Sequence, residues 1–276
     1  MVRFYLWICS LLFACFMHAR PLVYDCFLFL NEEEVLDIRL HEMGPYVDKF
    51  VIVESAETFR GNAKPFNFAQ WAPRFAPFKD KIIYVCIEGS FRTQSPWDRE
   101  TYQRNQIMRG LGDCKDDDII FISDVDEIVR GTDMAKVIAP LSRGEQPFVG
   151  VLQTYHSNYL NGTPSSELWC GPVATTFGYL KKTSPQHMRN MRGTGFTIMK
   201  GGWHFTWQGG VEADLYKLGA YSHAESDTPE GRKAKRDGFE LRYLAQTVPL
   251  DDSFPQYVRD NEAYLISIGF IRHNAN

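Results

Sequence analysis

The most distinctive chemical feature of the sequence is a group of carboxylates on both sides of one short apolar run: Asp116, Asp117, Asp118, Asp124, Asp126 and Glu127. Residues two positions apart on an extended segment point to the same face, so Asp124 and Asp126 can present oxygens to one cation. Carboxylate and phosphate oxygens suit Mg²⁺ and Mn²⁺. A solvated acidic turn is the alternative, and the position after a predicted buried strand favours the metal site.

A second group of chemically capable residues follows in 201–212, where glycine pairs and tryptophans surround one histidine and precede one glutamate. Tryptophan faces can stack on sugar rings, and glycine lets a ligand approach the backbone. His204 could supply a nitrogen ligand to the same metal, and Glu212 could act as a general base. A hydrogen-bonded core histidine and a carboxylate in the first turn of a helix are the alternatives. His223 and Glu225 form a further pair with the same ambiguity.

Four apolar runs in the first half of the chain predict buried strands: Val23–Leu30, Phe50–Val53, Lys81–Ile87 and Ile119–Ser123. Helical patterns lie between them, which predicts an α/β domain with a mainly parallel central sheet flanked by helices. Ligand sites in such sheets lie beyond the carboxyl ends of the strands. Glu54 and the acidic cluster at 124–127 occupy such positions.

Two predicted helices begin with capping signals. Asn31 is followed three residues later by Glu34, which predicts a capping box, and Ser95 precedes Pro96 at a first helical position. Residues 55–79 contain one glycine and three prolines and predict a long loop. Loops of that length are usually functional.

The first twenty residues are predicted to be separate from a single domain over 21–276. Residues 4–17 carry no charge, but fourteen helical residues span about 21 Å, less than the ~30 Å hydrocarbon core of a membrane. This length is typical of a secretory signal, with Ala19 as the candidate cleavage residue. A retained membrane anchor, or lipid attachment at Cys15, is the alternative. Each interpretation places the domain in a secretory pathway, in a bacterial envelope or outside the cell.

Outside that segment the chain has four cysteines: Cys26, Cys86, Cys114 and Cys170. Four cysteines allow three disulfide connectivities, and the sequence favours none of them. Cys26 and Cys86 lie in apolar runs, where buried free thiols are equally compatible. No CxxC pair is present, which argues against a structural zinc site.

The composition is that of an ordinary globular protein. The chain has 276 residues, of which 44% are hydrophobic, 14% aromatic and 23% charged. This mix excludes a disordered chain, a coiled coil and a multi-span membrane protein. The net charge of −4 provides no basic field for a nucleic acid. The basic run at 232–236 is typical of a solvated helix face, with contact to an anionic ligand or a membrane as the alternative.

Several motifs in the same order make residues 23–250 resemble glycosyltransferase family 17. The matching positions are 24–27, 31, 36–42, 47–55, 58–61, 64–65, 74–75, 79–82, 117–118, 123–128, 202–204 and 212. Two features depart from the family pattern: Val129 stands where a proline is expected, and residues 155–195, where an acceptor would bind, match poorly. The resemblance to the family therefore supports the donor chemistry better than the identity of the acceptor.

The resemblance implies a GT-A-like fold and inverting transfer of a sugar, N-acetylglucosamine in particular, from a UDP-sugar to a glycan or glycoprotein acceptor. A β-linked mannose of an N-glycan is one acceptor that it suggests. Mn²⁺ or Mg²⁺ held by Asp124, Asp126 and His204 would neutralise charge on the UDP leaving group. An inverting displacement also needs a base. Glu212 is the first candidate, with Glu127 and Glu225 as rivals.

Position and charge suggest further donor contacts. Glu54 and Ser55 would bind uracil or ribose, and Lys64 or Arg104 would meet a phosphate. The non-enzymatic alternative is a carbohydrate-binding protein on a degenerate transferase fold, against which the presence of both Asp124 and Asp126 argues. The tight spacing of these two aspartates also suits shared metal binding better than the opposed carboxylates of a hydrolase.

Overall fold

The computed structural model describes residues 20–89, 95–242 and 247–272. The predicted signal or anchor, including Cys15 and Ala19, lies outside these residues except for Arg20. Within the described ranges, no helix is both long and apolar enough to cross a membrane.

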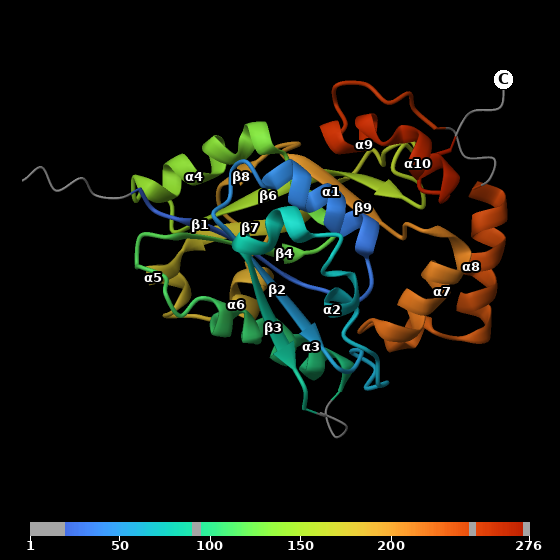
Figure 1. The fold of residues 1–276 in the computed structure, drawn as a ribbon, viewed down its shortest axis with the longest axis horizontal. Helices are drawn as coiled ribbons and strands as arrows, with labels where there is room; N and C mark the ends of the chain where they lie inside the picture. Colours follow the sequence, from blue (N-terminus) through green and yellow to red (C-terminus); the bar gives the residue numbers. More distant parts are fainter. Residues whose placement is uncertain (1–19, 90–94, 243–246, 273–276) are drawn as a thin grey trace, which may run out of the picture.

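The described strands form one nine-stranded sheet in the order β3-β2-β1-β4-β7-β6-β9-β5, with β8 paired to β6 (Figure 1). The strand bounds are β1 Val23–Leu28, β2 Lys49–Ser55, β3 Ile82–Ile87, β4 Ile119–Asp124, β5 Glu127–Val129, β6 Phe148–Ser157, β7 Leu168–Thr176, β8 Thr197–Ile198 and β9 Gly202–Thr206. The four predicted strands correspond to β1 to β4, with ends that differ by at most two residues.

The sheet is parallel in one half and mixed in the other. Strands β3, β2, β1 and β4 run parallel, as predicted. Strand β7 is antiparallel to both β4 and β6, and β5 is antiparallel to β9. Strands β6 and β7 follow each other without an intervening helix, and antiparallel neighbours need no crossover connection. The expected mainly parallel sheet is therefore corrected to a mixed one.

Helices cover both faces of the sheet, and α7 and α8 lie together at one end (Figure 1). Helices α1, α4, α9 and α10 pack over one face, while α5 and α6 pack over the other. The helix bounds are α1 Glu33–Met43, α2 Asn67–Trp71, α3 Pro96–Asn105, α4 Met134–Ser142, α5 Phe177–Leu180, α6 Pro185–Asn190, α7 Gly210–Ala220, α8 Pro229–Arg242, α9 Gln256–Asp260 and α10 Glu262–Ser267.

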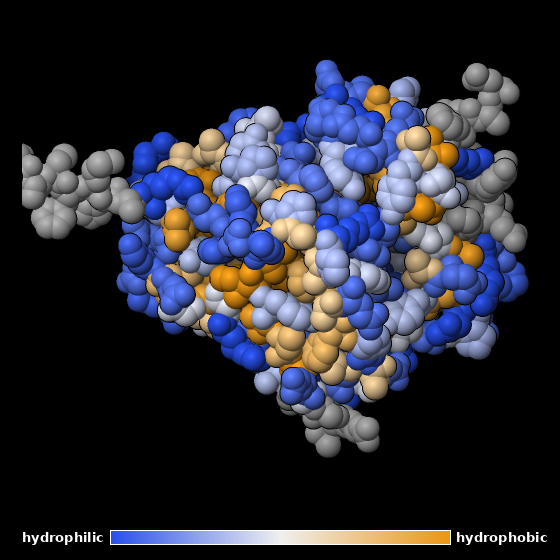
Figure 2. All heavy atoms as spheres, viewed as in Figure 1, coloured by the Kyte–Doolittle hydropathy of each residue, from blue (hydrophilic) through white to orange (hydrophobic). Residues whose placement is uncertain are grey.

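The core is divided by the sheet, because successive side chains of a strand point to opposite faces. On β1, Val23 and Phe27 face one cluster of buried apolar side chains, and Cys26 and Leu28 face the other. On the outside, polar residues predominate over the helices, and apolar residues gather near the middle of the face shown in Figure 2. Such burial on both faces explains why the predicted strands are mostly apolar, with Asp25 as the buried exception in β1.

Of the two predicted helix starts, one is confirmed and one is wrong. Ser95 caps α3, and its hydroxyl and the carboxylate of Asp98 form a capping box with each other's backbone N–H groups. Helix α1 starts at Glu33, without a side-chain cap. The Glu32 carboxylate instead accepts hydrogen bonds from the N–H groups of Leu30 and Asn31, so the start lies later than the expected Asn31 cap.

The four cysteines of the folded part are free thiols: Cys26, Cys86, Cys114 and Cys170. Cys26 is fully buried on β1, and Cys86 lies on the edge strand β3. The fold of the described residues therefore depends on packing and hydrogen bonds rather than on any of the three disulfide connectivities.

A candidate active site at the carboxyl ends of the strands

A pocket of about 480 Å³ opens beyond the carboxyl ends of β1, β2 and β4. Its wall includes residues 28–30 after β1, 57–59 after β2, and 124–126 after β4. Helices α3, α6 and α7 and the strands β6, β7 and β9 supply the other sides. The volume is in the range of small-ligand sites. The pocket therefore lies where the α/β pattern predicted a ligand site.

The shape of the acidic turn is set by Arg39, a fully buried residue of α1. Its Nη1 donates to the backbone carbonyls of Asp124, Val125 and Glu127 at 2.9, 3.1 and 3.0 Å. Its Nε and Nη2 donate to the two oxygens of the buried Asp25 carboxylate at 2.7 and 2.6 Å. One side chain thus fixes the backbone between β4 and β5 from behind the pocket.

Asp124 lies between two guanidinium groups. Its Oδ1 accepts from Arg104 Nη1 at 2.8 Å, and its Oδ2 accepts from Arg189 Nη2 at 2.7 Å. Burial alone would raise the pKa of Asp124, but the two arginines outweigh it and hold that pKa well below its ordinary range. Both carboxylate oxygens are therefore engaged, although 40% of the side chain is exposed to the pocket.

Asp126 is almost fully buried and has one oxygen paired with a cation. Lys217 Nζ donates to Oδ2 at 2.9 Å, while Oδ1 faces His204 Nε2 at 3.5 Å. Burial opposes the charged form, but Lys217 and His204 outweigh it, so the pKa of Asp126 lies well below its ordinary range. The carboxylate is thus ionised at neutral pH, and Oδ1 and His204 Nε2 are neighbours on the pocket wall.

These two atoms fit a divalent cation better than the expected three-residue set does. In the described part of the chain, no group of three or more His, Cys, Asp or Glu side chains surrounds a common point. Asp124 is engaged by arginines, so the structure does not leave it as a free ligand beside Asp126 and His204. Mg²⁺-type sites commonly use one or two protein ligands and complete their shell with substrate phosphates and water. Asp126 and His204 match that pattern in the number of protein ligands, with one imidazole nitrogen in place of a second oxygen.

Glu127 lies beneath the pocket rather than on its wall. It is fully buried, and Oε1 accepts from Trp169 Nε1 at 2.6 Å and from Arg189 Nη2 at 2.7 Å. Oε2 accepts from Arg189 Nη1 at 2.7 Å and from the Asp124 N–H at 2.9 Å. Four donors occupy this carboxylate, so the structure gives Glu127 a positioning contact with Arg189 and no access to an acceptor.

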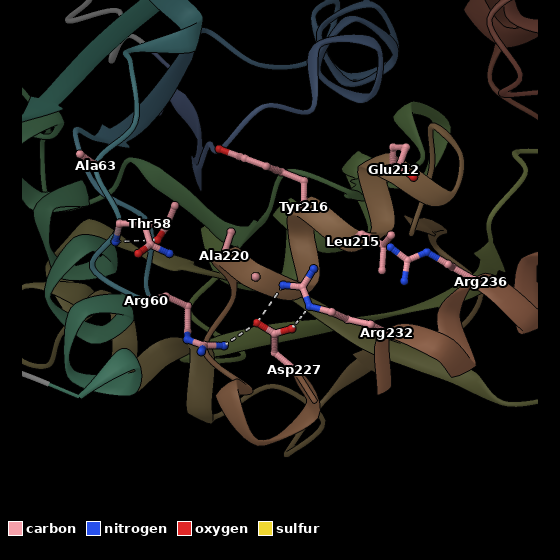
Figure 3. A pocket seen from close by; sticks show the side chains of 12 residues that line it. Thr58, Arg60, Ala63, Glu212, Leu215, Tyr216, Ala220, Asp227, Arg232 and Arg236 are labelled. Carbon is pink, nitrogen blue, oxygen red and sulfur yellow. Dashed lines mark hydrogen bonds and ion pairs between the residues drawn. The ribbon is translucent and has the colours of Figure 1, made fainter. Parts of the chain in front are cut away.

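Glu212, the first candidate base, lines a different pocket. It is exposed in the first turn of α7, and Figure 3 shows it at the opposite end of this helix from Ala220. The pocket in Figure 3 is lined by Arg60 and Arg232, which both contact Asp227. Thr58 and Ala220 line both pockets, so the two adjoin, but Glu212 is not among the residues of the wall that contains Asp126.

The four residues expected to bind the donor are also paired inside the protein. Glu54 is fully buried and accepts from Lys64 Nζ at 2.5 Å and from the N–H groups of Asn67 and Phe68 at the start of α2. Ser55 is buried beside it. Lys64 lines the pocket while paired to Glu54, and Arg104 lines it while paired to Asp124. Glu54 and Ser55 do not reach the pocket wall.

Arg192 is a pocket residue that the sequence analysis did not identify. It follows α6, and it is the cation of the described pocket wall with no carboxylate within 4.0 Å in the described ranges. Burial and the neighbouring Arg189 guanidinium hold the pKa of Arg192 below its ordinary value. An anionic ligand beside Arg192 would offset the repulsion between the two guanidinium groups and stabilise the charged form.

The fold is an α/β domain. Its pocket lies at the carboxyl ends of the strands and is lined by carboxylates that pair with arginine and lysine side chains. The model of glycosyltransferase family 17 matches residues 7–230, so the chain belongs to this family. The expectation of a glycosyltransferase is thereby confirmed. The expected α/β class is confirmed, with a mixed sheet in place of a mainly parallel one.

Curated relatives match a shorter segment. β-1,4-mannosyl-glycoprotein 4-β-N-acetylglucosaminyltransferase of Homo sapiens, and the enzyme of the same name of Rattus norvegicus, are each 31% identical over 106 residues. The match covers 36% of this chain and 20% of each relative.

Solved structures are more distant. The S. aureus TarS 1–349 structure has a TM-score of 0.42 and 10% identity, covering 91% of this chain and 83% of that one. Mannosyltransferase PcManGT from Pyrobaculum calidifontis, in complex with GDP-Man and Mn²⁺, has a TM-score of 0.44 and 11% identity, covering 90% and 81%.

Proposed function

We propose that this chain transfers N-acetylglucosamine from a UDP-sugar to a glycan acceptor, with inversion, in the pocket of Asp124 and Asp126. Family membership supports sugar transfer, and the names of the mammalian relatives support the particular sugar. The observation that supports the donor site is Arg192 on the pocket wall, which has no carboxylate partner within 4.0 Å in the described ranges.

One arginine of the described pocket wall has no carboxylate partner and suits a diphosphate. Five carboxylates and five cations are found on the described wall: Glu32, Glu57, Glu100, Asp124, Asp126, Lys64, Arg104, Arg189, Arg192 and Lys217. Glu54 and Glu127 lie behind the wall and pair with Lys64 and Arg189. The cations are thus neutralised except for Arg192. An arginine fork binds phosphate oxygens bidentately, so we assign Arg192 to the diphosphate of the donor.

A divalent cation would be held by Asp126 and His204, whose facing atoms are 3.5 Å apart. We favour Mn²⁺ over Mg²⁺, because the set includes one imidazole nitrogen and Mg²⁺ is bound through oxygen. When bound, the cation acts as a Lewis acid toward the phosphate oxygens. Lys217 keeps Asp126 ionised, and Arg104 and Arg189 fix Asp124 at the pocket mouth.

Inversion is proposed as a single in-line displacement. The acceptor oxygen forms a bond to the anomeric carbon as the bond from that carbon to UDP breaks, and the electron pair leaves on UDP. The acceptor proton must pass to a base on the protein. The negative charge that develops on UDP lies beside the Arg192 guanidinium, which stabilises it.

For the acceptor we propose a β-linked mannose of an N-glycan, following the names of the mammalian relatives. Such a substrate, carried on a glycan or glycoprotein, places the enzyme in a secretory pathway or a bacterial envelope, secreted or attached through its N-terminus.

Calorimetric titration with UDP in the presence of Mn²⁺ tests the donor site. We expect wild-type protein to bind UDP, and Arg192→Ala to weaken binding about tenfold or more, because a charge-assisted hydrogen bond contributes about 1.5–3 kcal/mol. Arg236→Ala is the matched control, since Arg236 is an exposed arginine of the pocket in Figure 3. An equal loss of affinity in Arg236→Ala, or glycan binding by a protein that does not bind UDP, would contradict the proposal.

A further inference from the structure

We infer that His223, oriented by Glu225, is the general base that takes the proton from the acceptor hydroxyl. This inference rests on the proposed glycosyl transfer and assigns the one catalytic role that the site leaves open. His223 lies on the wall of the pocket that contains Asp124 and Asp126. Its Nδ1 is 2.8 Å from Glu225 Oε1.

The pocket carboxylates are poorly suited to this role because each interacts with donors or cations. Asp124 and Asp126 interact with arginine and lysine, as described above. Glu100 accepts from Arg104 Nη2 at 2.6 Å and from Ser222 Oγ at 2.5 Å. Such contacts occupy the carboxylate oxygens, which a general base needs within hydrogen-bond reach of the acceptor hydroxyl.

The two remaining carboxylates of the described wall are similarly engaged. Glu32 accepts from the N–H groups of Leu30 and Asn31 at 3.1 and 3.0 Å. Glu57 is 3.9 Å from the Arg99 guanidinium. Histidine is the side chain whose ordinary pKa is closest to neutral, so His204 and His223 are the better candidates on the wall. His204 faces Asp126 and is assigned to the cation, which leaves His223.

The hydrogen bond to Glu225 selects the useful tautomer. A neutral imidazole has one N–H donor and one acceptor nitrogen. When Nδ1 donates its hydrogen to Glu225, Nε2 has the lone pair that can accept a proton. The Glu225 carboxylate then stabilises the imidazolium that forms, as the third member of a nucleophile–base–orienter arrangement does.

Aromatic rings beside His223 provide a surface for the acceptor sugar. Ring centroids are 4.7 Å apart for Trp97 and His223, 5.4 Å for His223 and Tyr221, and 5.7 Å for Tyr221 and Trp207. All four side chains line the pocket, and Trp97 is 48% exposed. Aromatic faces offer large amphipathic contact area, which suits the C–H face of a pyranose. The acceptor hydroxyl would thereby lie next to the base.

The turn that carries His223 is fixed to α3. Ser222 Oγ bonds the Glu100 carboxylate at 2.5 Å and the Pro96 carbonyl at 3.4 Å. In the proposed step, the acceptor O–H proton moves to His223 Nε2 while the acceptor oxygen bonds to the anomeric carbon. The bond to UDP breaks, and UDP leaves with the electron pair, so charge and atoms balance without a further reactant.

His223→Asn tests the assignment, assayed with UDP-N-acetylglucosamine and an N-glycan core oligosaccharide that contains the β-linked mannose. We expect kcat to fall at least about a hundredfold, in the range usual for loss of a general base. The Kd for UDP should change less than about twofold, because His223 is not assigned a contact with UDP. His187→Asn, an exposed histidine of α6 outside the pocket wall, should retain wild-type kcat. A His223→Asn variant that retains more than a tenth of wild-type kcat would overturn the assignment.

The Glu225→Gln variant tests whether Glu225 orients the His223 ring or only supports the local fold. If Glu225 only positions His223, kcat should fall about tenfold with an unchanged KM for the acceptor, and Glu225→Asp should recover part of the loss. Equal losses in kcat and acceptor affinity would instead indicate a structural role and contradict the proposed pair. Sugar transfer by the wild type tests the proposed function, whereas the ratio of variant to wild-type kcat tests the role of His223. Failure of the proposed function can therefore be distinguished from failure of the His223 assignment.

Discussion

Asp126→Asn is expected to lower the rate of sugar transfer by about 10²–10³-fold, the usual effect of removing one electrostatic contact to a developing charge. The substitution keeps the shape of the side chain but removes the negative charge that faces His204 and Lys217. A neutral amide binds a divalent cation weakly, so activity should also require much more Mn²⁺. Initial rates measured over a range of Mn²⁺ concentrations check both effects.

Two measurements make this result interpretable. Thermal unfolding of Asp126→Asn shows whether the fold survives the loss of the ion pair with Lys217. Glu212→Gln serves as the control, because Glu212 is exposed and lines the other pocket. We expect the Glu212 variant to retain near wild-type rates. Full activity in Asp126→Asn with an unchanged Mn²⁺ requirement would show that this aspartate does not serve the cation.

Arg39→Met is expected to lower the free energy of unfolding by about 3–5 kcal/mol, the usual cost of removing one partner of a buried ion pair. Arg39 and Asp25 are both fully buried, and their closest oxygen and nitrogen atoms are 2.6 Å apart. The variant leaves the Asp25 charge without its partner. It also removes the donor to the Asp124 carbonyl and so loosens the acidic turn.

Chemical denaturation of the purified variant measures this loss. Arg143→Met is the matched control: 60% of the Arg143 side chain is exposed, and its partner Glu145 is exposed as well, so a change of less than about 0.5 kcal/mol is expected. Adding Asp25→Asn to Arg39→Met should recover part of the lost stability, because the buried charge is removed. Unfolding curves that coincide for wild type and Arg39→Met would contradict the structural role of Arg39.

The parallel half of the fold could be predicted from sequence because both faces of its strands are buried. All residues of β1 are buried and all but Asp25 are apolar or aromatic, and Ser95 with Pro96 marks the start of α3. The mixed half lacks such a signal. Strand β6 spans Phe148–Ser157 and includes the polar residues Gln153 and His156. Both are buried by tertiary contacts, which cannot be predicted from the neighbouring residues in the sequence.

The candidate site was only partly predictable for a similar reason. Asp124 and Asp126 stand together in the sequence, and their spacing places them on the same wall. Their partners are single basic residues from distant helices, such as Arg189 and Lys217. No motif surrounds these residues, and pairing across 65 or 91 positions is decided by the packing of α6 and α7 on the sheet.

The predicted base Glu212 is not on the pocket wall that holds His204. It follows the aromatic segment of β9 closely, which suggested that it joins His204 in the site. The intervening Gly209 and Gly210 have positive φ angles of 94° and 88°, a conformation that glycine adopts readily, and they turn the chain into α7. In the first turn of α7, Glu212 lines the pocket shown in Figure 3, whereas Ala213 lines a cavity that also includes Asp126.

UDP release from a panel of UDP-sugars, measured with Mn²⁺ and with a chelator, tests the central claim most directly. The full chain would be supplied with an N-glycan core oligosaccharide as acceptor. We expect release from UDP-N-acetylglucosamine alone among the donors, dependent on the acceptor and lost on chelation. Equal release with and without the chelator would contradict the cation site of Asp126 and His204. No release from any UDP-sugar, together with binding of the oligosaccharide, would contradict the transferase and favour a carbohydrate-binding protein.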